Sequence, residues 1–230
     1  MELRERVGVE GAERTLRATD EAAIEEAREA LDWWRSLHAR PLSMVAANLR
    51  YHVLKAGAEV EGRVEVTQRL KRQDTLIGKL DRERGNVTQM QDIGGVRAVV
   101  PSVPHAYRVR RRLLKSWTIV RERDYIASPK DDGYRALHLV VRRAGLPIEV
   151  QVWTRGQDLW ANAIEEAGRQ TGVQFKFGEG PEKERAVFAN VAALIADVEE
   201  GKLSTTQLVT AGLIGAAIMN LSKRQEREAR

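Results

Sequence analysis

The strongest constraint on the fold is a pair of strand-like segments joined by a two-residue turn. Residues 134–143 and 147–153 are rich in residue types that favour β-structure, and the Ala-Gly pair at 144–145 is typical of a hairpin turn. A two-residue turn at this position makes His138 face Gln151 across the hairpin. The chain is therefore expected to contain an antiparallel hairpin with a defined register.

Alternation of side chains gives this hairpin two chemically different faces, because successive residues of a strand point to opposite sides of a sheet. One side is apolar and carries Leu137, Leu139, Ile148 and Val150. The other side carries Tyr134, His138, Glu149 and Gln151. The pattern leaves two interpretations open for this polar face, which is either a solvent-facing surface or the floor of a functional site.

The rest of the chain mixes helical and strand-like segments. Helical spacing runs from about residue 20 to 55 and is broken at Pro41, and Asp74 is the expected N-cap of a later helix. The other expected strands are 63–70, 96–100 and 117–123, and the other expected helices are 74–84, 104–115, 156–169 and 182–199. We predict an α/β (α+β) fold, with a mixed sheet flanked by helices and helical extensions at both ends.

Composition excludes several kinds of site. The chain has no cysteine, which excludes disulfides, a thiolate nucleophile and a cysteine metal site. The four histidines are scattered along the sequence, so carboxylates would have to hold any divalent cation. The N-terminus has no apolar signal-peptide core, and the longest apolar stretch, Leu208–Leu221, is too short to span a bilayer. We expect a cytoplasmic protein that does not enter the membrane.

Positive charge is concentrated in one segment. The formal net charge is +5, and residues 108–123 carry many basic side chains with Glu122 as the single acidic one. Such a run indicates a polyanionic partner, either nucleotide phosphates or a nucleic acid. A solvated basic face gives the same pattern, so charge alone does not decide between them.

Four segments in a fixed order carry a family resemblance. They are RLKRQDTLIGKLDR (69–82), DIGGVR (92–97), DYIASPKDDGYRALH (124–138) and EVQVWT (149–154). Together they resemble the synthetase domain of the RelA/SpoT family, the (p)ppGpp or alarmone synthetases. The resemblance covers roughly residues 60–165 and implies a nucleotidyltransferase-like fold.

The resemblance implies a pyrophosphokinase that transfers the β,γ-diphosphate of ATP to the ribose 3′-hydroxyl of GDP or GTP. The family's hydrolase domain is not visible and its regulatory domains have no room, so the sequence resembles a small synthetase. We expect a helical segment at 1–55, the synthetase core at 56–180 and a helical extension at 181–230.

The resemblance also implies a role for the polar side chains of the four segments. Those expected to bind ATP are Arg69, Lys71, Thr75, Lys79, Arg82 and Arg97. Asp92 is expected to bind Mg²⁺, and Glu149 is expected to contact the metal, to act as base toward the 3′-hydroxyl, or to do both. Those expected to bind the acceptor are Lys130, Tyr134, His138 and Gln151, with the tyrosine stacked on guanine. The residue types suit transfer of phosphate groups, which needs positioning and neutralisation of negative charge.

Three positions depart from the family pattern. Trp153 stands where the family commonly has an arginine, which removes a cation from the face that carries Glu149. The following WANAIEE lacks the family's histidine, and Glu165 matches the family's glutamate only with a shift of one residue. Thr75 replaces a serine. These departures leave the ATP and metal positions largely intact and put the identity of the acceptor in doubt.

Other functions remain open. A toxic branch of the small synthetases transfers pyrophosphate to the 3′ end of tRNA, and residues 108–123 would suit an RNA backbone. Another nucleotide is a further possible acceptor. A catalytically weak nucleotide- or RNA-binding regulator is the third alternative, against which the presence of both Asp92 and Glu149 argues. The apolar segment 207–222 is expected to pack in a core or an oligomer, or to dock an antitoxin.

Overall fold

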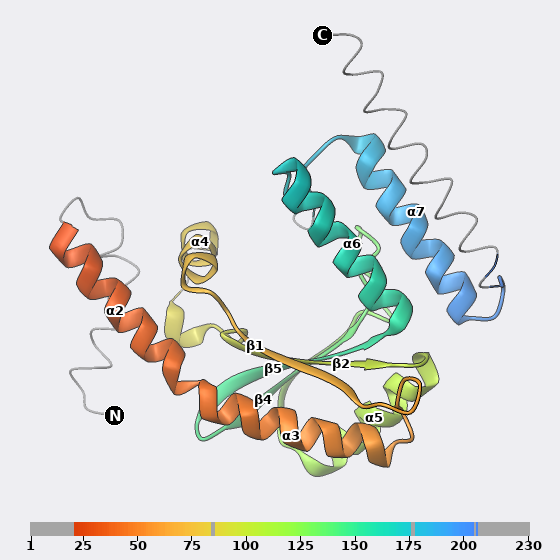
Figure 1. The fold of residues 1–230 in the computed structure, drawn as a ribbon, viewed down its shortest axis with the longest axis horizontal. Helices are drawn as coiled ribbons and strands as arrows, with labels where there is room; N and C mark the ends of the chain where they lie inside the picture. The colour runs from red at the N-terminus through yellow and green to blue at the C-terminus, as the bar shows by residue number, and fades with distance from the viewer. Residues whose placement is uncertain (1–20, 84–85, 176–177, 205, 207–230) are drawn as a thin grey trace, which may run out of the picture.

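The computed structural model describes residues 21–83, 86–175, 178–204 and 206, and a five-stranded mixed sheet forms its centre. The strands lie in the order β1 (Glu65–Leu70), β2 (Gly94–Val100), β5 (Leu146–Thr154), β4 (Leu137–Arg143) and β3 (Ile119–Asp124). β2 and β5 are parallel, and the other neighbouring strands are antiparallel. The predicted fold class, a mixed sheet flanked by helices, is confirmed (Figure 1).

Helices cover both faces of the sheet (Figure 1). The helices along one face are α3 (Ala39–Lys55) and α5 (Val103–Ser116). Those over the other face are α4 (Gln73–Glu83) and α6 (Arg155–Thr171), and α7 (Glu182–Glu199) packs against α6. A further helix, α2 (Glu21–Leu37), packs against α4 beside the short 3₁₀ turn η1 (Val87–Gln89).

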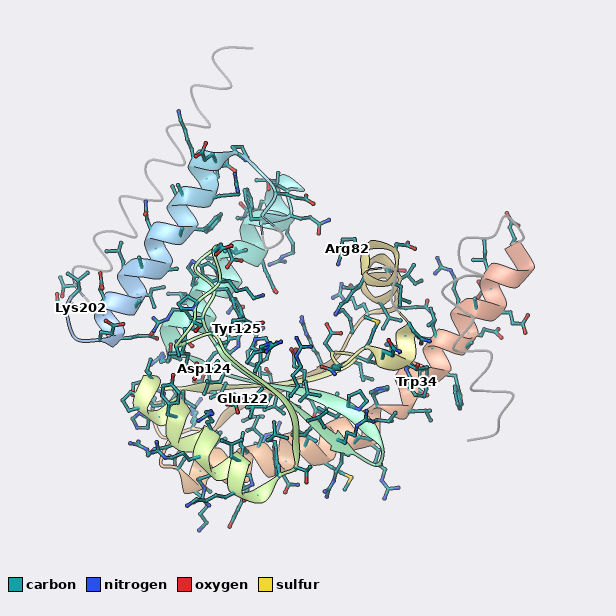
Figure 2. All side chains as sticks on the ribbon, turned by 180° about the vertical axis from the view of Figure 1, so that it is seen from behind. Trp34, Arg82, Glu122, Asp124, Tyr125 and Lys202 are labelled. Atoms are coloured by element: carbon teal, nitrogen blue, oxygen red, sulfur yellow. The ribbon has the colours of Figure 1, made fainter. Side chains whose placement is uncertain are left out.

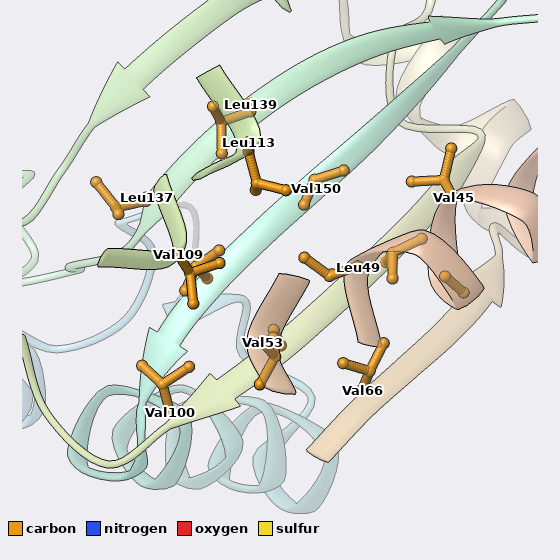
Figure 3. Packing of buried hydrophobic residues seen from close by; sticks show 14 of the residues in the cluster. Val45, Leu49, Val53, Val66, Val100, Val109, Leu113, Leu137, Leu139 and Val150 are labelled. Atoms are coloured by element: carbon orange, nitrogen blue, oxygen red, sulfur yellow. The ribbon is translucent and has the colours of Figure 1, made fainter. Parts of the chain in front are cut away.

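The face beneath α3 and α5 is the main hydrophobic core (Figure 3). Leu49 of α3 and Leu113 of α5 are fully buried against the strands of the sheet. The strands contribute Leu137, Leu139, Ile148 and Val150 to this cluster. Alternation assigned these four residues to the apolar face, and that prediction is confirmed. Full burial of such side chains typically contributes about 1.5–3 kcal/mol each.

The hairpin of β4 and β5 has the predicted register, with His138 facing Gln151. Ala144 and Gly145 have φ angles of 50° and 79°. Positive φ at both central residues is what a two-residue hairpin turn with the twist of the strands requires. The length of this turn fixes the register of β4 with β5. The apolar side chains reinforce that register, because a slip by one residue would move them from the core to the polar face of the sheet.

β4 begins at Leu137 and not at residue 134 as expected. The preceding residues belong to a loop, in which the N–H of Tyr125 donates to the carbonyl of Ala136 at 2.9 Å. The loop turns at Gly133, whose φ is 87°. Tyr134 therefore enters the site from a loop, although it lies on the side of the sheet that alternation predicted.

Two predicted helix boundaries are wrong. The N-terminal helical region is interrupted at His38, between α2 and α3, and not at Pro41. Pro41 lies in the first turn of α3, where a missing backbone N–H leaves no helical bond unmade. Asp74 is not the N-cap of α4 but lies in its first turn, where its carboxylate interacts favourably with the helix dipole.

The C-terminal part of the described chain packs on the core through α7. Phe188, Ala192 and Ile195 of this helix are buried against Trp153 and Trp160. The apolar segment 207–222 lies outside the described residues. Within the part of the chain that is described, no helix is both long and apolar enough to cross a membrane.

Candidate functional site

A cavity of about 650 Å³ lies over the polar face of the sheet. Every side chain that the sequence assigned to the site lines it: Arg69, Lys71, Thr75, Lys79, Arg82, Asp92, Arg97, Lys130, Tyr134, His138, Glu149 and Gln151. Figure 2 shows Arg82 on α4 and Tyr125, just after β3, on opposite sides of this polar face. The structure thus brings together residues from four separate segments of the sequence.

One wall of the cavity is basic and comes from β1 and α4. Arg69 lies at the exposed edge strand, and Lys71 follows directly after the strand ends. Thr75, Lys79 and Arg82 are spaced by four and three residues along α4, which puts them on one side of the helix. This wall can bind a chain of phosphates with charged groups from two elements.

Asp92 lies between the lysines of this wall. Its Oδ2 accepts from Nζ of Lys71 at 2.5 Å and from Nζ of Lys79 at 3.0 Å. Burial alone would raise the pKa of the Asp92 carboxyl, but the charges and hydrogen bonds of the two lysines outweigh it and lower that pKa. The backbone next to Asp92 is closely packed, since a Cβ at Gly94 would lie 2.8 Å from Cδ1 of Ile148.

Asp92 and Glu149 together fit a magnesium ion. They line the same cavities, and Oδ1 of Asp92 is buried with no hydrogen-bond partner among the described residues. The described residues contain no cluster of three or more metal-ligating side chains. Mg²⁺ commonly takes one or two protein carboxylates and completes its shell with substrate phosphates and water, so two carboxylates suffice.

Glu149 is held by two hydrogen bonds. Its Oε1 accepts from Nδ1 of His138 at 2.9 Å, and its Oε2 accepts from Nε2 of Gln151 at 2.8 Å. Burial would raise the pKa of the Glu149 carboxyl, but the hydrogen bond and charge of His138, aided by Gln151, outweigh it and lower that pKa. Glu149 is therefore ionised and oriented at neutral pH.

Tyr134 completes a chain of hydrogen bonds that ends at this carboxylate. Its hydroxyl lies 2.5 Å from Nε2 of His138. Burial, and next the negative charge of Glu149, raise the pKa of the Tyr134 hydroxyl, so it remains a donor. The other ring nitrogen of His138, Nδ1, donates to Oε1 of Glu149. The three side chains thus form a chain of hydrogen bonds that fixes the orientation of Glu149.

A second cavity of about 380 Å³ adjoins the first. Four residues line both cavities and form their shared wall: Lys79, Asp92, His138 and Glu149. The second cavity is also lined by Arg121, Arg123 and Tyr125, which the sequence analysis did not place in the site. Arg123 lies opposite His138 in the pairing of β3 with β4, and this pairing brings it to the polar face.

The basic run 108–123 is therefore divided between the two sides of the sheet. Arg121 and Arg123 line the second cavity. Arg110 lies on α5, on the other face, and forms an ion pair with Glu122. Arg108 of the same helix donates from Nε to the carbonyl of Ala56 at 3.2 Å. The helical half of the run thus stabilises the fold on the face away from the cavities.

Lys130 and Tyr134 lie together in the loop before β4. Nζ of Lys130 is 4.9 Å from the ring centroid of Tyr134 and 5.0 Å from that of Tyr125. The two tyrosine rings meet edge to face at 5.7 Å. This loop is seated on α7, because a Cβ at Gly133 would lie 2.5 Å from Cβ of Ala192.

A buried carboxylate of α7 also anchors this region. Glu199 forms an ion pair with Arg135 at 2.7 Å, and both side chains are only 9% exposed. It also accepts hydrogen bonds from Thr154, at the end of β5, and from Gln157 of α6. No local sequence pattern indicates this role for α7, because Glu199 contacts residues that lie far from it in the chain.

Comparisons with known proteins agree with this arrangement. A family model described as "Region found in RelA / SpoT proteins" matches residues 68–170. The GTP pyrophosphokinase YjbM of Bacillus subtilis is 33% identical over 132 residues, which cover 51% of this chain and 60% of YjbM. The GTP pyrophosphokinase YwaC of the same organism is 26% identical over 151 residues, which cover 57% of this chain and 72% of YwaC.

A solved structure shares the fold. The small alarmone synthetase 1 from Bacillus subtilis, bound to its product pppGpp, superposes with a TM-score of 0.59 and 23% sequence identity. The superposition covers 74% of this chain and 94% of the synthetase.

The fold and the charged face define a mixed α/β domain whose larger cavity is lined by cations and by the carboxylates of Asp92 and Glu149. Residues 68–170 match the RelA/SpoT family model and the relatives named above are GTP pyrophosphokinases, so the resemblance carried by the four sequence segments is confirmed.

Proposed function

We propose that this chain is an ATP-dependent pyrophosphokinase that transfers the β,γ-diphosphate of ATP to the 3′-hydroxyl of GDP or GTP, making (p)ppGpp. One observation carries the proposal: Asp92, His138 and Glu149 lie on the wall between two cavities lined by cations. Such a wall lets a donor and an acceptor reach one carboxylate from two sides. The activity named for YwaC and YjbM supports the same reaction.

In the proposed reaction the acceptor's 3′ oxygen forms a bond to the β-phosphorus of ATP. The bond from that phosphorus to the oxygen bridging the α- and β-phosphates breaks, and AMP leaves. The proton of the 3′-hydroxyl passes to Glu149, which is ionised and oriented by His138 and Gln151. This assigns Glu149 the role of general base.

The larger cavity would hold ATP. Arg69, Lys71 and Lys79 would bind its phosphates, with Thr75 and Arg82 on the same side of α4. Mg²⁺ held by Asp92 and Glu149 would neutralise charge on the transferred diphosphate. Arg97 would complete the ATP site from β2, as a further cation that lines this cavity.

The acceptor would lie across Glu149 from ATP, partly in the larger cavity beside the loop before β4 and partly in the smaller cavity. Tyr134 and Lys130 would contact the base and phosphates from the loop before β4, with His138 and Gln151 below them. Arg121 and Arg123 would bind the acceptor's remaining phosphates in the smaller cavity. Among the described residues, three cations line that cavity, counting Lys79, and they suit a nucleoside di- or triphosphate.

A nucleotide acceptor is favoured over tRNA by the division of the basic run. Arg110 of α5 is paired with Glu122 on the face away from the cavities, so this helix does not extend the site. An RNA acceptor would need a continuous basic path along its backbone. The two arginines that do reach the site, Arg121 and Arg123, are enough for one nucleotide.

The test is label transfer from γ-³²P-ATP. The purified chain is incubated with Mg²⁺ and, in separate reactions, GDP, GTP, AMP and bulk tRNA. The proposal predicts labelled guanosine tetra- or pentaphosphate and little label in tRNA. Labelled tRNA without labelled guanosine nucleotides would overturn the choice of acceptor, and no label in any acceptor would overturn the activity.

A further inference from the structure

Trp153 contacts Arg97, and this contact has no role in the reaction proposed above. Its side chain is 3% exposed and lines the larger cavity from β5. Cζ of Arg97, on the neighbouring strand β2, lies 3.8 Å from the centroid of the Trp153 ring. In the pairing of β2 with β5, Val99 lies beside Trp153. Arg97 precedes Val99 by two residues on β2, and its long side chain extends along the strand to the indole ring of Trp153. At this distance the guanidinium stacks on the indole in a cation–π contact.

Arg97 has a second anchor on α6. Its Nη1 donates to Oδ1 of Asp158 at 3.0 Å. Asp158 is itself fixed, because its Oδ2 accepts from Nδ2 of Asn162 at 3.0 Å. Asp158 is the one hydrogen-bond partner of Arg97 within the described residues. The guanidinium is thus held by an indole and a carboxylate, and its remaining N–H groups have no partner in the described protein.

We propose that Trp153 is a positioning residue that holds Arg97 in place for the donor nucleotide. The inference rests on the proposed function, since it takes the larger cavity as the ATP site. An arginine at position 153 would put a second positive charge on the strand next to Arg97, whereas the indole attracts Arg97. The departure at Trp153 therefore removes one cation from the cavity and supports Arg97 on the neighbouring strand.

The same indole also contacts the acceptor side of the site. The ring of Tyr134 meets it edge to face, with centroids 5.7 Å apart. Edge contacts between neutral rings are weaker than a desolvated cation–π contact. Loss of the indole should therefore affect ATP more strongly than the acceptor.

The test compares Trp153→Leu, which keeps apolar packing without an aromatic face, with Trp153→Phe, which keeps the face. Binding of a non-hydrolysable ATP analogue is measured by calorimetry, and KM and kcat are measured separately. Trp153→Leu should weaken analogue binding and raise the KM for ATP by about 2- to 30-fold, with a smaller change in kcat. Trp153→Phe should recover most of the loss. Trp117→Phe, on the far side of the sheet, is the matched control and should leave analogue binding unchanged.

A double-mutant cycle separates positioning from general loss of packing. In an Arg97→Ala background, Trp153→Leu should have almost no further effect on analogue binding, because the supported group is gone. An equal loss in both backgrounds, or unchanged analogue binding by a folded Trp153→Leu, would overturn the proposal. Calorimetry needs no turnover, so an inactive wild type that binds the analogue would contradict the proposed function and leave this test intact.

Discussion

The two faces of the sheet use the same strands for different purposes. On β4 and β5, Leu139 and Val150 point into the core beneath α3 and α5, while His138 and Glu149 point into the cavities. Neighbouring residues along one strand therefore serve stability and chemistry in turn. The contrast shows that substitutions one residue apart should separate the two properties in this molecule.

The basic run shows the same contrast on a larger scale. Arg110 on α5 is paired with Glu122 behind the sheet, whereas Arg121 and Arg123 reach the cavities in front of it. Residues that look alike in sequence thus belong to different layers. Charge in this segment predicts a partner only for the residues on β3.

The largest expected effect comes from the carboxylates of the polar face. Glu149→Gln removes the proposed base and should lower kcat by about 10²- to 10⁴-fold, while the melting temperature stays close to that of the wild type. Asp92→Asn should have a comparable effect on turnover through the metal. Steady-state AMP release and thermal unfolding measure the two properties. Near-normal turnover by a folded Glu149→Gln would refute its role as base.

The reverse result is expected one strand away, on the apolar face. Leu139 is fully buried, so Leu139→Ala should destabilise the fold by about 2–5 kcal/mol. The protein that remains folded should keep a kcat within about threefold of the wild type, because the cavities are on the other face. Urea unfolding with turnover measured in the folded range checks both. A large loss of kcat in fully folded Leu139→Ala would break the separation of the faces.

Removing or reversing positive charge at separate positions tests the division of the basic run. Arg123→Gln should raise the KM for GDP or GTP by roughly 10- to 100-fold, since a hydrogen bond to a charged group contributes about 1.5–3 kcal/mol. The combined variant with Arg110, Arg111 and Arg112 changed to glutamate should keep that KM nearly unchanged. Initial rates at varied acceptor concentration measure both. If the triple variant loses acceptor use and Arg123→Gln does not, the assignment of the two halves is reversed.

A smaller effect is expected at the acceptor platform. Tyr134→Ala should weaken acceptor use by about 1–3 kcal/mol, the usual contribution of a base stacked on an aromatic ring. Binding of ATP should change less, because most of the proposed ATP cations come from α4 and from the end of β1. Tyr51→Ala, an exposed tyrosine of α3, is the control. Loss of ATP affinity with intact acceptor use would mean that donor and acceptor sides are exchanged.

The smallest expected effect is on stability at low pH. The pKa of Asp92 is lowered in the folded protein, mainly by Lys71 and Lys79 acting against burial. A lowered folded pKa stabilises the fold above the unfolded pKa, near 4, and this contribution is lost as the pH falls through the folded value. Urea unfolding at neutral pH and near pH 3 should show a smaller acid-induced loss in Asp92→Asn than in the wild type. An equal loss in both proteins would contradict the shift, and exposed Asp131→Asn is the control.

Local patterns predicted the parts of the site that depend on local structure. The turn at residues 144–145 and the alternation along β4 and β5 were enough to place His138 opposite Gln151, beside Glu149. Arg121 and Arg123 could not be placed, because their position depends on which strand β3 pairs with. The stacking of Arg97 on Trp153 joins two parallel strands far apart in the chain, and no local pattern reports such a contact.

The roles of individual residues depend on these long-range contacts. The strand containing Tyr134 was predicted too long because residues 134–136, which follow the turn-rich residues 124–133, continue the alternating pattern of β4 although they belong to the loop. The family resemblance supplied the ATP and acceptor assignments, and the structure gathers those residues around one cavity. Their individual roles stay predictions until the variants are measured.

The central claim is that one carboxylate between two cavities directs a diphosphate from ATP to a guanosine nucleotide. The most direct measurement is the stoichiometry of products, with AMP and guanosine 3′-diphosphate products quantified together by ion-exchange chromatography in wild type and Glu149→Gln. The wild type should release about one AMP for each guanosine tetra- or pentaphosphate that it forms, and Glu149→Gln should form almost none of either product. AMP without a guanosine 3′-diphosphate, or equal product yields from both proteins, would contradict this claim.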